Sequence, residues 1–252
     1  MVKPIDGRPY EQLATFYDEL LGDRFFPRLR RTFEWIERRY GLHFASAADV
    51  GCGTGTFVAY LRRRGVHPVW GVDRSPEMLA QAASKNTGNG ARFLLQDMRA
   101  LRLPHPVDLL TCQFDTLNYL LTTADLRVVL AAFARALKPG GHALFDVVTP
   151  RSVEPGRTPR LELARNTHWM VTRRTRYDSR RRLQVARVRI ADPSETRSEM
   201  HLQRAFTVAE IVAALDGSGL RLRGMHDFSQ VARPVHRAER AVFLANRTTK
   251  II

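Results

Sequence analysis

The sequence has few cysteines and no long apolar run. Its 252 residues include only two cysteines, Cys52 and Cys112, which are too few for a disulfide framework or a metal cluster. We expect both to be core residues, and we expect no metal centre. No run of 18 apolar residues occurs, and the N-terminus MVKPIDGRPY lacks the basic-then-apolar layout of a signal peptide. The sequence therefore predicts a cytoplasmic protein without a membrane-spanning helix.

Lysine is also scarce, although the formal net charge is +15. Only four of the 40 basic residues are lysines. Residues 1–150 hold 19 basic and 15 acidic residues, a net charge of +4, whereas residues 151–252 hold 21 and 10, a net charge of +11. The excess centres on the arginine-rich run 173–182. Such a run is typical of a solvated hairpin tip, and a phosphate or other polyanion partner is the alternative.

Glycines at alternate positions form the most informative stretch of the chain. A short apolar strand, 47–50, contains Asp49 and leads into Gly51, Gly53 and Gly55, and a helix is predicted to follow. Glycine permits positive φ and lets the backbone approach a ligand, while a helix start offers unpaired N–H groups. The dinucleotide fingerprint G-x-G-x-x-G would need a glycine at position 56, where this chain has Thr56. The pattern therefore predicts a nucleotide-binding turn with a different spacing.

Further segments follow this turn in a consistent order. Residues 68–73 read as a buried strand that ends in Asp73, 22 residues after Gly51, where Rossmann-type folds place the carboxylate that binds ribose hydroxyls. A third apolar run ends at Asp97 and Met98. A fourth strand, 107–113, leads into Phe114, and residues 137–147 contain a helix stop, a Gly-Gly turn and a fifth strand.

Together these motifs, over residues 47–148, resemble those of the class I S-adenosylmethionine (SAM)-dependent methyltransferases, in which G-x-G-x-G is motif I. The resemblance implies SAM as the cofactor. It also implies that Asp97 contacts the adenine amino group and that Met98 packs on the adenine ring. The residues expected to bind the cofactor are Asp49, Gly51, Gly53, Gly55, Asp73, Arg74, Met78, Asp97, Met98, Phe114 and Tyr17.

The expected fold class is α/β. Strand and helix alternate up to residue 148, which predicts right-handed βαβ units and a parallel sheet with helices on both faces. Apolar residues at helical spacing predict N-terminal helices over 11–21 and 25–40. The resemblance implies a seven-stranded, mostly parallel, Rossmann-like sheet.

The segments after Pro150 differ in pattern. A Pro/Arg linker, 151–160, precedes three β-like runs with turn residues between them, which predict an antiparallel insertion. We expect four parts: an N-terminal helical lid (1–45), a SAM-binding core (46–150), the insertion as a cap over the acceptor (151–206), and a closing helix and hairpin (207–252). The β-like runs cover 168–177, 182–190 and 198–207, and the closing part holds a helix at 208–215 and strands at 221–228 and 241–247.

Three residues are candidates for catalysis. Asp115 follows the fourth strand, where it could hold an acceptor ammonium, orient a hydroxyl, or cap the next helix. Tyr17 lies in a stretch, 10–21, that resembles the N-terminal lid of bacterial small-molecule methyltransferases, including sugar N-methyltransferases, in which a tyrosine reaches over SAM and the acceptor. Its spacing is also that of a core residue. His201 is either a structural residue or a general base.

These features favour methyl transfer to nitrogen or oxygen of a small-molecule acceptor by in-line displacement. Residues 113–115 read Gln-Phe-Asp, unlike the pattern of methyltransferases that act on adenine or glutamine amino groups. An RNA methyltransferase that uses the arginine-rich insertion is the alternative, and a non-catalytic SAM-binding scaffold is a third. A homodimer is compatible with the sequence.

Overall fold

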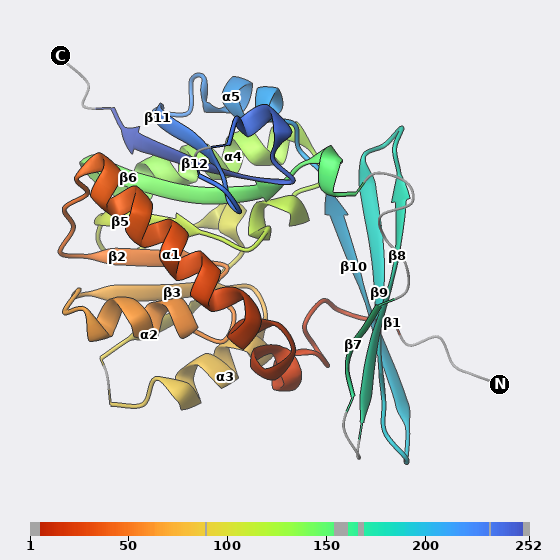
Figure 1. The fold of residues 1–252 in the computed structure, drawn as a ribbon. Coiled ribbons are helices and arrows are strands. Elements are labelled where there is room, and N and C mark those ends of the chain that lie inside the picture. Colours follow the sequence, from red (N-terminus) through yellow and green to blue (C-terminus); the bar gives the residue numbers. More distant parts are fainter. Residues whose placement is uncertain (1–5, 89, 154–160, 166–168, 232, 249–252) are drawn as a thin grey trace.

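The strands of the protein form two separate sheets. The computed structural model describes residues 6–88, 90–153, 161–165, 169–231 and 233–248. Figure 1 shows a large sheet with helices on its faces and a smaller sheet that stands beside it. None of the helices in these ranges is long and apolar enough to cross a membrane.

The large sheet has seven strands in the order β11-β12-β6-β5-β2-β3-β4. All neighbours from β4 to β6 are parallel, and β12 is antiparallel to both β6 and β11. The predicted Rossmann-like sheet and its antiparallel closing hairpin are therefore confirmed. The strands are β2 (Ala47–Val50), β3 (Val69–Asp73), β4 (Arg92–Leu95), β5 (Val107–Cys112), β6 (Leu137–Val148), β11 (Leu220–Asp227) and β12 (Arg240–Arg247).

Residues 137–147 differ from their prediction at the Gly-Gly pair, Gly140 and Gly141. β6 already begins at Leu137, which pairs with Val107, and pairing resumes between His142 and Leu109. The intervening residues, including Gly140 with φ +77°, bulge out of the sheet. The glycines therefore make a bulge inside a strand rather than a turn before it.

Helices cover both faces of the large sheet. α1 (Asp23–Tyr40), α2 (Thr56–Arg63) and α3 (Pro76–Lys85) lie on one face, and α4 (Thr123–Ala136) and α5 (Val208–Leu215) on the other. α1 buries Leu29, Phe33 and Ile36, which share one helical stripe. α5 begins at a capping box between Thr207 and Glu210. Both buried cysteines belong to these two cores, as expected.

The small sheet has five strands in the order β1-β10-β9-β8-β7. Its antiparallel part confirms the predicted insertion: β8 (Met170–Asp178), β9 (Leu183–Ala191) and β10 (Thr196–Arg204). Two strands were not predicted, β7 (Leu161–Arg165) and the two-residue β1 (Asp6–Gly7), which pairs parallel with β10. Residues 1–45 and 151–206, expected as separate parts, thus share one sheet. Most of the predicted linker, 154–160, lies outside the described residues.

The predicted first helix is replaced by irregular turns. Residues 11–21 form a turn, the 3₁₀ helix η1 (Ala14–Phe16) and the π-helix η2 (Asp18–Gly22), which continues into α1. The backbone N–H groups of Gln12 and Leu13 donate to the Glu199 carboxylate of β10. A tertiary contact therefore fixes the start of this segment, and Leu13 and Leu20 pack with Val171, Val188 and Ile190 of the small sheet.

Candidate functional site

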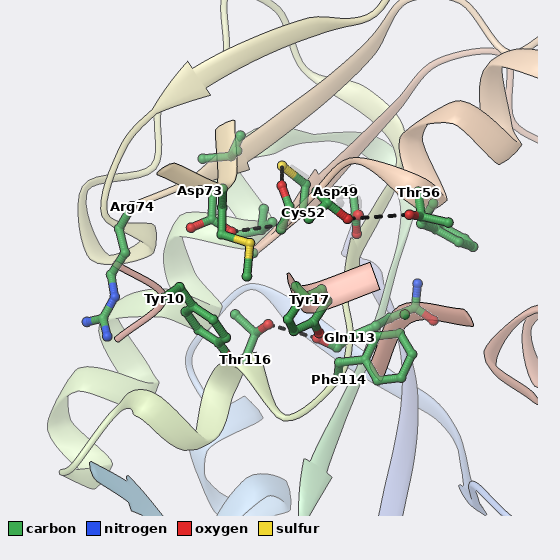
Figure 2. Close-up of a pocket in the computed structure, with 18 of the residues that line it drawn as sticks. Tyr10, Tyr17, Asp49, Cys52, Thr56, Asp73, Arg74, Gln113, Phe114 and Thr116 are labelled. Carbon is green, nitrogen blue, oxygen red and sulfur yellow. Dashed lines mark hydrogen bonds between the residues drawn. The ribbon is translucent and has the colours of Figure 1, made fainter. Parts of the chain in front are cut away.

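A pocket opens at the carboxyl ends of β2, β3 and β5 (Figure 2). It measures about 980 Å³ when the part open to solvent is included. Ligands of open parallel sheets bind at this edge. Nine of the predicted cofactor residues line it: Asp49, Gly51, Gly53, Asp73, Arg74, Met78, Met98, Phe114 and Tyr17. Gly55, Asp97, Asp115 and His201 do not line it.

The three glycines of the turn differ in what surrounds them. All three have positive φ. A Cβ on Gly51 would lie 2.3 Å from the Thr116 side chain, whereas a Cβ on Gly53 would meet only the Met78 sulfur, at 4.0 Å. A Cβ on Gly55 would collide with Asn86 and neighbouring side chains, at 2.8 to 3.2 Å. Gly53 thus opens the turn toward the pocket, and Gly55 allows close packing against α3.

Asp73 connects the end of β3 to the glycine turn. Its Oδ2 accepts the N–H of Gly53 at 2.9 Å, and its Oδ1 accepts the N–H of Ser75 at 2.9 Å. Burial raises the pKa of this carboxyl, against the lowering effect of these N–H groups. A carboxylate has about four acceptor positions. Asp73, which lines the pocket, therefore keeps acceptor capacity for a ligand.

Asp49 lies under the same turn and is almost fully buried. The hydroxyl of Thr111 donates to its Oδ1 at 2.6 Å. Burial raises the pKa of Asp49 to about 7, although the Thr111 hydrogen bond opposes the shift. The charge of this pocket residue therefore changes near neutral pH.

The structure does not bring Asp97 into the pocket. Its carboxylate accepts the backbone N–H of Arg99 at 2.9 Å and an Nη2–H of the same residue at 2.6 Å. Gln96 and Met98, on either side of it in the chain, do line the pocket. The adenine contact expected of Asp97 would require its carboxylate to leave Arg99.

Aromatic side chains of the N-terminal segment and of the loop after β5 face the glycine turn across the pocket. The rings of Tyr10 and Tyr17 meet edge to face at 5.8 Å, and the Arg74 guanidinium lies 5.1 Å above the Tyr119 ring. Burial raises the pKa of both Tyr10 and Tyr17 well above the usual value. Within the described part of the chain, the Tyr17 hydroxyl has no hydrogen-bond partner.

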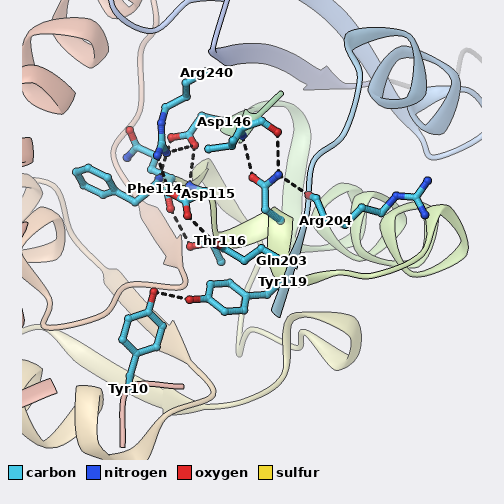
Figure 3. A network of polar contacts seen from close by, with 12 residues as sticks. Tyr10, Phe114, Asp115, Thr116, Tyr119, Asp146, Gln203, Arg204 and Arg240 are labelled. Carbon is cyan, nitrogen blue, oxygen red and sulfur yellow. Dashed lines mark hydrogen bonds and ion pairs between the residues drawn. The ribbon is translucent and has the colours of Figure 1, made fainter. Parts of the chain in front are cut away.

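Asp115 does not cap the helix that follows it. Its side chain makes no capping hydrogen bond to η4 (Thr116–Tyr119). Instead its Oδ1 accepts from Arg240 at 2.5 Å and its Oδ2 accepts from Gln203 at 2.6 Å (Figure 3). Arg240 also donates to Asp146, at 2.7 Å, so both carboxylates share one guanidinium. Asp115 thus joins β5, β12 and β10 with both oxygens occupied.

His201 lies outside the pocket but touches its wall. It is buried on β10, with Nε2 2.7 Å from Glu199 Oε1 and Nδ1 2.6 Å from the Tyr119 hydroxyl. The sequence contained no signal for Glu199, because its partners Tyr10, Gln12 and Leu13 lie 186 to 189 residues away.

Comparison with known proteins assigns the chain to a family. A family model described as "Methyltransferase domain" matches residues 47–141. A dTDP-4-amino-2,3,4,6-tetradeoxy-D-glucose N,N-dimethyltransferase of Saccharopolyspora spinosa is 30% identical over 189 residues, which cover 70% of this chain and 71% of that protein. A putative methyltransferase of Geobacillus sp. (strain WCH70) is 34% identical over 141 residues, 55% of this chain and 57% of the relative. The chain thus spans little more than half the length of that relative.

A solved structure is similar as well. The SAM-bound amino pentose methyltransferase of Micromonospora echinaspora is 27% identical, with a TM-score of 0.67 over 87% of this chain and 91% of that one. A Rossmann-like sheet, a glycine turn and a carboxylate at the end of the second parallel strand define a nucleotide-binding protein. Because the family model, the relatives and the solved structure also match, the chain belongs to the class I SAM-dependent methyltransferases.

Proposed function

We propose that this protein transfers the methyl group of SAM to nitrogen or oxygen of a small-molecule acceptor. The observation that carries the proposal is the pocket itself. Its floor is the Gly51–Gly53 turn with Asp73, and its opposite wall is aromatic. The floor offers hydrogen-bond acceptors for the ribose, and the aromatic wall offers an apolar surface against which an acceptor can meet the methyl group.

The Tyr10, Tyr17 and Tyr119 side chains define where the acceptor would lie. They come from the N-terminal segment and η4, and all three line the pocket. The similar proteins from Saccharopolyspora spinosa and Micromonospora echinaspora are named as methyltransferases of amino sugars. Nucleotide-activated amino sugars are therefore the first acceptors to test.

The RNA alternative depended on the arginine-rich run. In the structure, residues 179–182 form the turn between β8 and β9, and Arg182 pairs with Glu210 of α5 at 2.6 Å. Arg181 is largely exposed. These arginines lie at a solvated hairpin tip and none of them lines the pocket, which supports a small-molecule acceptor.

One experiment tests the proposal. The purified protein is incubated with SAM and with dTDP-amino sugars, the corresponding hydroxy sugars, or bulk tRNA, and S-adenosylhomocysteine is measured. We expect product with a sugar and none with tRNA. Replacing Arg180, Arg181 and Arg182 by glutamine should leave the turnover nearly unchanged. Turnover with tRNA alone, steeply dependent on salt and lost in the triple variant, would contradict the proposal.

A further inference from the structure

A continuous chain of hydrogen bonds leads from the pocket wall into the small sheet. The hydroxyls of Tyr10 and Tyr119 are 2.8 Å apart (Figure 3). The Tyr119 oxygen lies 2.6 Å from His201 Nδ1, and His201 Nε2 lies 2.7 Å from Glu199 Oε1. Tyr10 and Tyr119 line the pocket, while His201 and Glu199 are buried behind them. The chain therefore links the acceptor space to a buried imidazole.

Glu199 is held in one orientation by four donors. Besides His201, the backbone N–H groups of Tyr10, Gln12 and Leu13 donate to its two oxygens at 2.9 to 3.1 Å. These donors compensate the charge of a fully buried carboxylate. The same contacts fix Tyr10, whose φ is +68°, so Glu199 orients both ends of the hydrogen-bond chain.

We infer that Tyr10, Tyr119 and His201 form a proton relay that takes up the proton that a protonated amino acceptor must lose before its nitrogen can be methylated. Tyr10 is the group that would touch the acceptor. His201 acts through Tyr119, and Glu199 is a positioning residue that orients the imidazole. This inference rests on the proposed methyl transfer and concerns a step that the cofactor itself does not provide.

The transfer balances without a further reactant. In the structure the Tyr119 O–H donates to the Tyr10 oxygen. The relay requires both hydroxyl protons to rotate about their C–O bonds, with His201 donating Nε2–H to Glu199, so that Tyr10 donates to Tyr119 and Tyr119 donates to Nδ1. A lone pair of Tyr10 then takes a proton from the acceptor, the Tyr10 proton passes to Tyr119, and the Tyr119 proton passes to Nδ1. The acceptor loses one proton and His201 becomes an imidazolium beside Glu199. After product leaves, the reverse transfer gives this proton to water in the pocket.

The surroundings fit this direction of transfer. Burial raises the pKa of Tyr10 and of Tyr119, so both keep their protons and pass them on rather than store a charge. Asp115 is not placed to act as the base in this structure, because it does not line the pocket and its carboxylate is paired with Arg240.

Several polar and charged groups face the relay within the residues that the structure describes. His201 faces Glu199 on its own strand and Tyr119 of η4, and its neighbour on β9 is the uncharged Ala186. Arg74 lies over the Tyr119 ring, and Asp73 and Asp115 act electrostatically on Tyr10. These groups remain in every variant below, so a change in pH profile can be assigned to the relay.

The first test reads the imidazole directly and needs no acceptor. Nitrogen-15 NMR of histidine-labelled protein, with His201→Gln for assignment, reports the tautomer and charge of His201. We expect a neutral ring with its proton on Nε2 near neutral pH, and a changed Nδ1 signal in Tyr119→Phe. An imidazolium at every pH at which the protein is folded would overturn the relay, because such a ring cannot accept a proton.

The second test is kinetic. With the amino sugar that the wild type methylates, Tyr119→Phe and His201→Gln should lower the single-turnover rate at pH 7 tenfold or more. The deficit should shrink as the pH rises, because the amine then arrives without its extra proton. A matched control exists in Tyr40→Phe, which removes a 2.8 Å contact between Tyr40 and His226 away from the pocket and should leave the rate unchanged.

The outcomes separate this inference from the proposed function. A deficit that is equal at all pH values, or a wild-type rate in Tyr119→Phe, would overturn the relay while methyl transfer stands. If the wild type methylates no sugar, the proposed function fails, and the NMR test still decides whether His201 can accept a proton.

Discussion

Replacement of Asp73 by alanine tests the cofactor site most directly. The Asp73 carboxylate accepts backbone N–H groups, including those of Gly53 and Ser75, and has acceptor capacity left for the ribose. Hydrogen bonds to a charged group contribute about 1.5 to 3 kcal/mol. With each factor of ten in affinity equal to about 1.4 kcal/mol, Asp73→Ala should weaken SAM binding by about 10- to 150-fold.

The same change also removes the hydrogen bond that joins the glycine turn to the end of β3. We expect the melting temperature to fall by a few degrees, since about 1 kcal/mol shifts it by roughly 2 to 4 °C in a protein of this size. Asp97→Ala is a matched control, because it removes a carboxylate that pairs with Arg99 and does not line the pocket. It should change SAM affinity less than about twofold.

Isothermal titration calorimetry with SAM, on proteins shown by circular dichroism to be folded, distinguishes the two variants. Equal SAM affinity in wild type and Asp73→Ala would refute the assignment of the ribose site. A large loss in Asp97→Ala would show instead that the Asp97 carboxylate leaves Arg99 when SAM binds, as the family resemblance implies.

Four further predictions concern the pocket and its glycine turn. Burial raises the pKa of Asp49 to about 7, and the positively charged sulfonium of SAM, bound beside it, would favour the ionised carboxylate. SAM should therefore bind more tightly as the pH rises from 6 to 8, and its binding at pH 6 should release up to one proton from Asp49. Calorimetry in buffers of different ionisation enthalpy measures both effects, and Asp49→Asn should remove them. The raised pKa also means that the free protein loses stability as the pH rises from about 4 to 7, a loss that Asp49→Asn should abolish in thermal scans. Gly53→Ala should mainly weaken SAM binding, whereas Gly55→Ala, with similar backbone strain but a crowded Cβ, should mainly lower the melting temperature; the reverse pattern would contradict the roles given to the two glycines. Tyr17→Phe should lower the single-turnover rate tenfold, about 1.4 kcal/mol of barrier, without a change in melting temperature, and equal rates would show that Tyr17 is only a wall of the pocket.

The parts of the fold that could be predicted are those in which the residues in contact lie close together in the sequence. The glycine turn lies between β2 and α2 in a single contiguous stretch, and β3 ends in the acid that the turn needs. The alternation of strands and helices predicts right-handed βαβ units and a parallel sheet, and the family resemblance implies its seven strands. The insertion strands were predictable for the same reason, because β8, β9 and β10 are joined by short turns.

Contacts between distant segments explain what could not be predicted. Asp115 is bound by Gln203 and Arg240, 88 and 125 residues away, and no local pattern indicates either partner. The irregular start of the N-terminal segment likewise depends on Glu199. Asp97 is a different case. Its partner Arg99 lies only two residues further along the chain, so the sequence itself indicates that Arg99 can compete with adenine for the Asp97 carboxylate.

The contact between the N-terminal segment and β10 also sets an order of events during synthesis. Residues 10–13 leave the ribosome early, but Glu199, which accepts the Gln12 N–H, lies 187 residues behind. At about 5 to 20 residues per second, the two segments emerge about 10 to 40 s apart. The parallel strands can pair during that interval, whereas Tyr10 and Tyr17 cannot yet be placed over them. Residues 10–13 are therefore translated well before they can find their position, and until Glu199 emerges the glycine turn is open to solvent.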